Sequence, residues 1–300
     1  MSVAYVFPGQ GSQFVGMGLE QAQHRPIFRG VFLRADALLG FPLSQQCWYG
    51  PAEALNDTLN TQPAIFTHSL AAYEMVKLSE ELPAPAFVAG HSLGELSALC
   101  AAGALTFEDG LRLARERGRL MKEAGERAPG SMAAVIGLDA QTLEAVCREA
   151  SARHHPGVVV ANDNAPGQIV ISGGKEAVAA ATELAKAKGA KRVILLNVSV
   201  ASHSPLMAEA AEAFAQVVAR TPVAPAQVPV VANTTARPIT HPDDIRAELA
   251  AQLTAPVRWV ESVRAMHQAG VTLFVELGPK DVLCGLIKRI VEGVETRAIG

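Results

Sequence analysis

The sequence predicts an α/β protein with a large domain built on a mostly parallel sheet and a smaller domain inserted into it. Short apolar runs alternate with longer segments of helical periodicity through most of the 300 residues, as in chains that form parallel sheets. Residues 90–94 form a glycine-flanked turn between a strand-like run and a helix-like run. Residues 129–198 instead follow the order strand, helix, strand, strand, helix, strand, which is the ferredoxin-like arrangement.

The large domain is expected to comprise residues 1–128 and 199–300. Its predicted strands are short apolar runs bounded by turn residues, at residues 3–7, 86–89, 228–232 and 273–276. Its clearest predicted helices have apolar residues at spacings of three and four, and several begin at Ser, Thr, Asp or Pro. These helices lie at residues 62–82, 107–125, 205–220 and 245–253.

The small domain is expected to comprise residues 129–198. Its predicted strands are residues 132–136, 158–161, 168–172 and 192–195, and its predicted helices are residues 140–152 and 175–188. Pro129 and Gly130 mark the entry into this domain, because these residue types break regular structure. The exit, near residues 198–202, has no compositional mark.

Composition and charge describe a globular chain and exclude several classes of function. Apolar residues make up 49% of the chain and charged residues 18%, so the chain can bury a large core and is not disordered. A net charge of -3 gives no basic footprint for nucleic acid or for an anionic membrane. The cysteines are too far apart to suggest a disulfide frame or a zinc site; they are Cys47, Cys100, Cys147 and Cys284.

The N-terminal region lacks the features of a secretory signal. The first predicted strand begins almost at once, without a basic segment followed by a long apolar stretch. No uninterrupted apolar run of the chain approaches the roughly 18 residues that a membrane-spanning helix requires. We therefore expect a soluble, cytoplasmic protein.

Ser92 is the strongest candidate for a catalytic residue. It lies at the centre of the motif Gly-His-Ser-Leu-Gly at residues 90–94, between the strand-like residues 86–89 and the helix-forming residues 95–104. This pattern is typical of a nucleophile elbow, a turn so tight that its flanking positions require glycine. The turn also places the serine at a helix N-terminus, where free N–H groups and the dipole stabilise an oxyanion. The alternative is a chance match with a solvated loop serine.

A serine nucleophile needs a base, and His203 is the best placed of the eight histidines. It follows a run of small residues and precedes a helix that starts at Pro205, which predicts a position at the end of a loop. His91 adjoins Ser92, but neighbouring residues in an extended segment point to opposite sides. His68 lies within a predicted helix and fits a core histidine. The alternative for His203 is a solvated loop histidine without a catalytic role.

No residue is a clear choice for the third group that would orient the base. Asp109, Asp139 and Asp163 lie between Ser92 and His203, where an α/β-hydrolase keeps its acid, but none follows a convincing strand of the large sheet. A pair of serine and histidine, with the imidazole held by a backbone carbonyl, therefore stays open as an alternative to a triad.

Arg117 is predicted to point into the protein. The helix at 107–125 has an apolar stripe, and Arg117 falls on that side, three residues after Ala114 and four before Met121. A buried guanidinium stays charged and needs an anion, and its planar fork fits a carboxylate best. The sequence favours a receptor for a substrate carboxylate, and the alternative is a structural salt bridge to an internal Asp or Glu.

Gln10 lies in a glycine-rich turn, residues 7–13, directly after the first predicted strand. The turn lacks the Lys-Ser/Thr pair of a phosphate-binding P-loop. A polar loop at the carboxyl end of a parallel strand is where open α/β sheets bind ligands. Gln10 is therefore expected to line the site or to offer its backbone N–H to an oxyanion hole.

Several separate motifs occur along the chain in one order. They are Phe-Pro-Gly-Gln-Gly-Ser-Gln at 7–13, Gly-His-Ser-Leu-Gly-Glu at 90–95, Arg-Gly at 117–118, the segment 162–173, the segment 200–203, Gln-Leu at 252–253 and Pro-Val-Arg-Trp at 256–259. In these motifs the chain resembles, over essentially its whole length, the malonyl-CoA:acyl carrier protein transacylases of bacterial type II fatty acid synthesis. The resemblance implies an α/β-hydrolase-like large domain with a ferredoxin-like small domain.

The resemblance implies a reaction in which Ser92 attacks the thioester of malonyl-CoA and His203 takes its proton. A malonyl-serine ester results, and the phosphopantetheine thiol of holo acyl carrier protein then takes the malonyl group, in a ping-pong transfer. The family holds its histidine through a main-chain carbonyl near the position of Gln252, which would explain the missing acid. No cofactor or metal is implied, because the phosphopantetheine is carried by the partner protein.

The resemblance also implies how the substrate is bound. Arg117 would pair with the malonyl carboxylate, and the backbone N–H groups of Gln10 and Leu93 would form the oxyanion hole. Asn162 belongs to a segment that would face the cleft. A monomer is expected, without nucleic acid or membrane as a partner.

The chain departs from the family pattern at a few positions. Leu96 stands where tyrosine is common, and Lys280 follows Gly278 and Pro279 where a second glycine is usual, which leaves the shape of that turn open. Ala201 lies in a stretch that separates malonyl from methylmalonyl selectivity in polyketide acyltransferases, and it does not decide that choice.

Other functions stay open on the sequence alone. With the same chemistry, the chain would load a polyketide synthase or the carrier subunit of a malonate decarboxylase. As a serine hydrolase it would release a free acid to water, although the inward Arg117 argues against a broad esterase. An inactive carrier-docking protein is disfavoured, because Ser92, His203 and Arg117 are all present.

Overall fold

The large sheet consists of β1 (Ser2–Phe7), β2 (Phe87–Gly90), β7 (Val230–Val231), β8 (Pro238–Ile239), β9 (Val271–Leu277) and β10 (Glu295–Ile299). The computed structural model describes residues 2–79, 81–196, 198 and 200–300. In these residues the strand order is β10-β9-β1-β2-β7-β8. The pairs from β10 to β7 are parallel, and β8 runs antiparallel to β7 at one edge.

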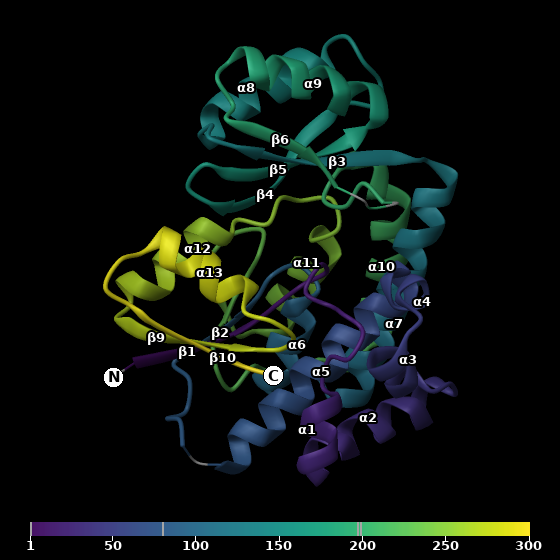
Figure 1. Ribbon diagram of the computed structural model, residues 1–300, viewed down its shortest axis with the longest axis vertical. Helices are drawn as coiled ribbons and strands as arrows, with labels where there is room; N and C mark the ends of the chain where they lie inside the picture. Colours follow the sequence, from purple (N-terminus) through teal and green to yellow (C-terminus); the bar gives the residue numbers. More distant parts are fainter. Residues whose placement is uncertain (1, 80, 197, 199) are drawn as a thin grey trace.

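Alternate residues of β1 pack against two different layers of helices. Val3, Tyr5 and Phe7 belong to one apolar core, and Ala4 and Val6 to another, as in a strand that is buried on both faces. The first core is enclosed by α1 (Leu19–His24), α2 (Pro26–Leu39), α3 (Leu43–Tyr49), α4 (Ala52–Asn56), α5 (Thr58–Ser79), α6 (Gly94–Ala101), α7 (Phe107–Arg127), α10 (Ala208–Arg220) and α11 (Pro242–Ala251). The second core lies under α12 (Trp259–Gln268) and α13 (Val282–Ile290) (Figure 1).

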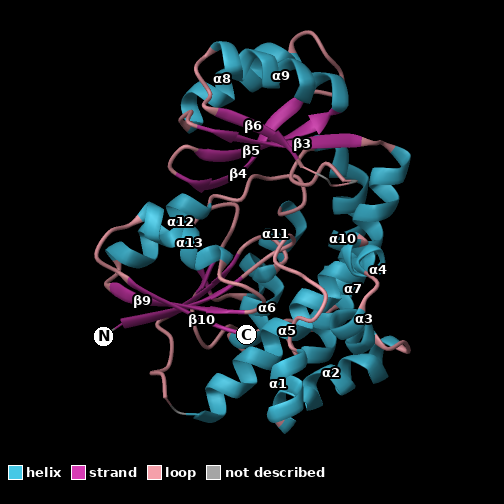
Figure 2. Ribbon diagram, in the orientation of Figure 1, coloured by secondary structure: helices cyan, strands magenta, loops and turns pink. Residues whose placement is uncertain are grey.

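A second sheet lies above the large one in Figure 1. It consists of β3 (Gly130–Ile136), β4 (Val158–Ala165), β5 (Gln168–Gly174) and β6 (Arg192–Leu195), in the antiparallel order β4-β5-β3-β6. Two helices, α8 (Ala140–Ser151) and α9 (Lys175–Ala187), cover one face of this sheet (Figure 2). The other face carries Met132, Ala161 and Val170 and is turned toward the large sheet. This is the ferredoxin-like arrangement that the sequence predicts.

The elements of the second sheet match the predicted order strand, helix, strand, strand, helix, strand. In the large part, the predicted strand at 228–232 is shorter, and the predicted helix at 205–220 starts with a 3₁₀ turn, Pro205–Met207. The division into residues 1–128 with 199–300 and residues 129–198 stays a prediction, and residue 199 lies outside the described residues. None of the described helices is long and apolar enough to cross a membrane.

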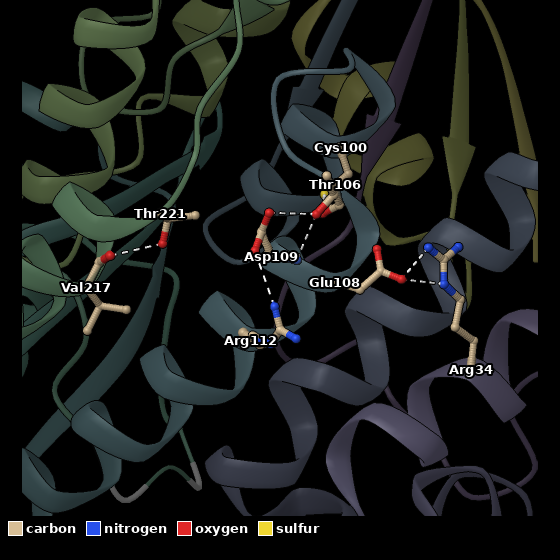
Figure 3. A network of polar contacts seen from close by, with 8 residues as sticks. All are labelled: Arg34, Cys100, Thr106, Glu108, Asp109, Arg112, Val217 and Thr221. Carbon is tan, nitrogen blue, oxygen red and sulfur yellow. Dashed lines mark hydrogen bonds and ion pairs between the residues drawn. The ribbon is translucent and has the colours of Figure 1, made fainter.

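The helix α7 begins at a side-chain cap. The Thr106 hydroxyl accepts the Asp109 backbone N–H at 3.1 Å and donates to the Asp109 carboxylate at 2.7 Å (Figure 3). In the same turn, the Glu108 carboxylate accepts a hydrogen bond from Arg34 Nε of α2 at 2.7 Å. A capped first turn that is tied to a neighbouring helix has a defined starting point. These contacts therefore define where the helix that carries Arg117 begins.

Candidate active site

Ser92 occupies a tight turn between β2 and α6. Its φ angle is +53°, in the left-handed region that residues other than glycine rarely adopt. A Cβ atom on Gly90 would lie 1.9 Å from the carbonyl carbon of Gly94, and one on Gly94 would lie 2.1 Å from the carbonyl oxygen of Phe7. Because no side chain fits into these spaces, both glycines are required. The turn has the tight geometry that the sequence predicts.

His203 contacts the Ser92 hydroxyl. Its Nε2 lies 2.8 Å from Ser92 Oγ. Its Nδ1 lies 2.9 Å from the carbonyl oxygen of Gln252 and 3.0 Å from that of Ala255. Since carbonyl oxygens only accept hydrogen bonds, Nδ1 carries the proton. Nε2 is then the acceptor that faces the serine hydroxyl.

His203 is buried, with 2% of its surface exposed, so the alternative of a solvated loop histidine is wrong. Burial, followed by the charges of Arg117 and His91, lowers the pKa of His203 to about 3. The imidazole is therefore neutral at neutral pH. A neutral imidazole is the form that accepts a proton.

The three aspartates that were considered for the third group lie elsewhere. The Asp109 carboxylate accepts the Thr106 hydroxyl in the first turn of α7, and Asp139 caps α8. The backbone N–H of Asp163 donates to the carbonyl oxygen of Val257 at 3.0 Å. Among the described residues, the acceptors at His203 Nδ1 are the two carbonyl oxygens. Their positions match the alternative of a serine and histidine pair without an acid.

Arg117 is turned inward, as its place in the apolar stripe predicts, and 1% of its surface is exposed. Its Nη1 donates to Gln62 Oε1 at 2.9 Å, and its Nη2 donates to Gln252 Oε1 at 2.9 Å and to Ser92 Oγ at 3.1 Å. Within the described chain, no carboxylate lies within 4.0 Å of the guanidinium, so the alternative of a structural salt bridge is wrong.

Neutral groups therefore surround a buried positive charge. Burial lowers the pKa of Arg117 to about 10, against the opposite effect of Glu95, so the side chain is cationic at neutral pH. Its Nε, which is also buried, has no hydrogen-bond partner among the described residues. A buried charge without a counter-ion in direct contact is costly. The arrangement suits an anion that arrives from outside.

A cavity of about 180 Å³ opens on these groups. Ser92, Arg117 and His203 line one side, and Met132 and Val170 of the second sheet line the other. The face of the second sheet that carries no helices thus forms the roof of the site. A larger hollow of about 820 Å³ shares Gln10, Leu196 and Val198 with this cavity.

Gln10 and Leu93 lie on two segments that meet at the elbow. A Cβ atom on Gly9 would lie 2.4 Å from the carbonyl oxygen of His91, so the loop of Gln10 packs against the turn. Leu93 is the residue that precedes α6, where helix N–H groups lack partners in the helix. Within the described chain, the backbone N–H groups of both residues have no protein acceptor. Their roles in an oxyanion hole stay a prediction.

Asn162 and His91 also line the cavity. Asn162 is buried, with 6% of its surface exposed, and forms a bridge with Val257. His91 Nε2 lies 2.7 Å from Asn164 Oδ1, and its ring packs edge-on against Trp259 at 5.7 Å. The expectation that His91 points away from the site is wrong, because it lies in the turn rather than in the strand. The alternation of an extended strand does not apply there.

The turn after β9 forms with lysine where the family usually has glycine. Lys280 has a φ angle of +66°, in the region that favours glycine. Its Nζ donates to the carbonyl oxygens of Gly11 and Gln13, both at 3.3 Å. The side chain therefore ties this turn to the loop that carries Gln10. The second departure, Leu96, is buried in the first core.

Sequence reasoning missed four polar residues around the elbow. Gln62 accepts from Arg117, and Asn164 contacts His91. Asn233 and Glu95 form a buried network beneath Ser92. The elbow motif contains a signal for Glu95 alone, as a charged residue in the apolar first turn of a helix. The other three come from distant parts of the chain without a local pattern.

Several known proteins are similar to this chain in both sequence and fold. The acyl transferase domain family matches residues 4–298. The malonyl CoA-acyl carrier protein transacylase of Bacillus subtilis (strain 168) is 45% identical over 297 residues, which cover 99% of this chain and 93% of that protein. The chain belongs to the malonyl CoA-acyl carrier protein transacylase family. It is therefore an acyltransferase, as the motifs predict.

Other members of the transacylase family agree with this assignment. The malonyl CoA-acyl carrier protein transacylase of Escherichia coli (strain K12) is 46% identical, with 99% of this chain and 95% of that protein covered. The structure of the transacylase from Coxiella burnetii superimposes with a TM-score of 0.96 at 40% identity, covering 100% of this chain and 94% of that one. A malonyl-transacylase solved in complex with a type II polyketide acyl carrier protein has a TM-score of 0.95 at 41% identity, covering 99% and 96%.

Proposed function

We propose that this transacylase moves the malonyl group of malonyl-CoA to the phosphopantetheine thiol of an acyl carrier protein, through a malonyl ester on Ser92. One observation carries the proposal: Ser92 Oγ contacts His203 Nε2 at 2.8 Å and Arg117 Nη2 at 3.1 Å. A base and a receptor for a carboxylate thus meet at a single hydroxyl. This pairing suits an acyl group that carries its own negative charge.

The first half of the reaction loads the enzyme. Ser92 Oγ forms a bond with the thioester carbon while its proton passes to His203 Nε2. The tetrahedral intermediate then collapses, the carbon–sulfur bond breaks, and the imidazolium returns the proton to the leaving CoA sulfur. In the second half the carrier thiol gives its proton to His203 and attacks the ester, and Ser92 regains its proton as it leaves.

The protonated form of His203 is stabilised by its two carbonyl neighbours. The Nδ1–H group keeps its hydrogen bonds to Gln252 and Ala255 while Nε2 takes up a proton. A carbonyl dipole stabilises the imidazolium less than a carboxylate does, because it carries only a partial charge. The malonyl carboxylate offsets this difference when it neutralises Arg117, whose charge lowers the pKa of His203.

Arg117 selects the acyl group in this proposal. An incoming carboxylate pairs with a guanidinium that is held by neutral acceptors and that has a buried Nε without a partner. The planar fork of arginine binds a carboxylate with two hydrogen bonds. An acetyl group would leave the cation unpaired in a closed site. We propose that the backbone N–H groups of Gln10 and Leu93 hold the oxyanion.

The substrates enter through the larger hollow in this account, with Asn162 facing the acyl group. The chemistry needs no cofactor of the enzyme, because the phosphopantetheine arrives on the carrier. We further propose that the enzyme works in the cytoplasm as a monomer. The relatives include enzymes named for acyl carrier protein and one solved with a polyketide carrier, so a panel of holo carriers decides which carrier it serves.

Initial rates with varied malonyl-CoA and holo acyl carrier protein test the mechanism. A malonyl-enzyme predicts parallel lines in a double-reciprocal plot, because CoA leaves before the carrier binds. Intersecting lines would indicate a complex of all reactants and contradict the proposal. Fast release of malonate with no transfer to a carrier would instead identify a serine hydrolase.

A further inference from the structure

Glu95 lies fully buried beneath the elbow, one turn of α6 beyond Ser92, and the transfer chemistry does not use it. Its exposed surface is 0%. One carboxylate oxygen, Oε1, accepts the backbone N–H of Asn233 at 2.8 Å and the side-chain Nδ2 of Asn233 at 2.9 Å. The other, Oε2, accepts Gln252 Nε2. A carboxylate is rarely buried so completely unless its oxygens are satisfied.

Asn233 connects this carboxylate to the backbone of the elbow. Its Oδ1 accepts the backbone N–H of Ser92 at 2.7 Å, and its Nδ2 donates to the carbonyl oxygen of Gly90 at 2.7 Å. The asparagine therefore holds both sides of the turn. Because Ser92 has a left-handed φ of +53°, the turn needs such support to keep its conformation.

Gln252 connects the same carboxylate to Arg117. Its Nε2 donates to Glu95 and, at 3.0 Å, to the carbonyl oxygen of Ser92. Its Oε1 accepts Arg117 Nη2 at 2.9 Å. A carboxylate only accepts, so it draws the NH₂ end of the amide toward itself. The oxygen end then faces the guanidinium.

We propose that Glu95 is a positioning residue, which sets the Ser92 peptide through Asn233 and the Arg117 guanidinium through Gln252. The inference rests on the proposed function, because it assigns one buried carboxylate to the nucleophile and to the receptor of the acyl carboxylate. Glu95 touches neither group directly. It fixes where the acyl carbon and the acyl carboxylate must lie relative to each other.

The neighbouring Glu248 provides a matched comparison. It is also buried, with 6% of its surface exposed, and accepts the backbone N–H of Thr234 at 2.9 Å and the Thr234 hydroxyl. Burial, followed by Glu248, raises the pKa of Glu95. The acceptor of the Ser92 N–H is Asn233 and an acceptor of Arg117 is Gln252, and the side chains of both donate to Glu95. The Glu248 side chain also contacts Glu95 and the backbone N–H of Asn233, but among the described residues it makes no side-chain hydrogen bond to Gln252, Ser92 or Arg117. Glu248→Gln thus alters a similar buried carboxyl and leaves the Gln252 amide its acceptor on Glu95.

Glu95→Gln should break the hydrogen bond between Gln252 and Arg117. The new NH₂ group cannot face Asn233, whose backbone N–H is fixed, so it faces Gln252. The Gln252 amide must then turn over and present its NH₂ to Arg117. The variant keeps the size of the side chain but removes an acceptor from the guanidinium and a donor from the Ser92 carbonyl.

Two reagents separate these effects. Malonyl-enzyme formation, followed by intact mass after rapid quenching, depends on Ser92 and Arg117. Labelling by a neutral fluorophosphonate depends on Ser92 and His203 and offers no carboxylate to Arg117. For Glu95→Gln we expect malonylation to slow about 100-fold and labelling about 10-fold, since small displacements in an active site have effects of this order. Glu248→Gln should slow each less than threefold.

Asn233→Ala tests the other arm and serves if Glu95→Gln does not fold. It removes the link to Ser92 and keeps Gln252 in place, so both reagents should slow by the same factor. The proposal is overturned if Glu95→Gln leaves the ratio of the two rates unchanged, if Glu248→Gln changes it equally, or if Asn233→Ala changes neither rate. A wild-type enzyme that reacts with the fluorophosphonate but not with malonyl-CoA would contradict the proposed function instead.

Discussion

Arg117 has the most unusual environment of the residues around the cavity. Its guanidinium is buried against two carboxamides and a hydroxyl, which satisfy hydrogen bonds but bring no carboxylate into contact with the charge. The Glu95 carboxyl acts on it only across the Gln252 amide. A carboxylate that pairs with this cation therefore has to come from a bound substrate. Charge-assisted bonds between guanidinium and carboxylate are about twice as strong as neutral ones. The gain on binding is correspondingly larger for a dicarboxylic acyl group.

Replacing Arg117 should change the acyl preference of the enzyme. For Arg117→Gln, we expect kcat/KM with malonyl-CoA to fall at least about 100-fold, because removing one member of a buried ion pair costs several kcal/mol. The value with acetyl-CoA should change much less, so the ratio of the two measures the effect. Arg115→Gln is the matched control, since Arg115 donates to Leu59 O and Asn60 Oδ1. An unchanged ratio in Arg117→Gln would show that Arg117 is only structural.

The sequence predicted three residues that meet in the cavity, Ser92, His203 and Arg117, because each carries a local signal. A glycine-flanked turn, a loop before a helix and a helical stripe are all visible in the chain. The contacts between them are not visible, and neither is Asn233, which lies 138 residues from Glu95. No pattern of spacing relates such positions, since only the tertiary fold brings them together.

At the scale of elements, α7 acts as a rigid arm that presents Arg117. A Cβ atom on Gly118 would lie 2.7 Å from the carbonyl oxygen of Thr58, so α7 and α5 pack closely beside the arginine. Thr106 caps the N-terminus of the helix, about three turns away (Figure 3). The helix was predictable because it is long and its apolar stripe is regular. The short helices α1, α3 and α4 were not predicted, because a few residues show no clear period. The longer α2, with 14 residues, was also missed.

Removing the cap of α7 should affect stability and spare the reaction. Thr106→Ala is expected to lower the free energy of unfolding by about 1 kcal/mol, the usual cost of a lost N-cap. Thr106→Ser keeps the hydroxyl and should stay within a few tenths of a kcal/mol of wild type. Denaturant unfolding measures both values. A large loss of malonyl transfer in folded Thr106→Ala would contradict the view that the distant packing at Gly118 positions Arg117.

At the scale of the whole molecule, the site lies between the mostly parallel large sheet and the antiparallel second sheet. The large sheet supplies the elbow at the carboxyl end of β2, and the open face of the second sheet supplies the roof. The order of elements in both was predictable, because hydrophobic periodicity reports it. The position of Val170 above Ser92 was not predictable. The sequence pattern shows that helices cover one face of the second sheet, but it does not show what the other face packs against.

Burial of neutral histidines predicts how stability depends on pH. His68 of α5 is 1% exposed and packs edge-on against Phe28, and burial lowers its pKa to about 3. Below about pH 6.5 this histidine binds a proton in the unfolded chain but not in the folded protein. The free energy of unfolding therefore decreases by about 1.4 kcal/mol for each unit by which the pH is lowered. The stability of wild type relative to His68→Gln should follow this slope between pH 6.5 and about 4.

The region above pH 7.5 is the internal control for this comparison. There, His68 is neutral in both states, so the difference between wild type and His68→Gln should be constant. Urea unfolding at each pH gives the two free energies. A difference that stays constant down to pH 4 would show that His68 accepts a proton in the folded state.

The central claim is that Ser92 carries the malonyl group between the two thiols. Mixing the enzyme with malonyl-CoA, removing the free CoA and weighing the intact protein tests it most directly. We expect one added malonyl group on wild type, located on Ser92, and none on Ser92→Ala. The group should leave when holo acyl carrier protein is added. A wild-type enzyme that malonylates the carrier without ever gaining mass, or a Ser92→Ala variant that gains it equally, would contradict the account.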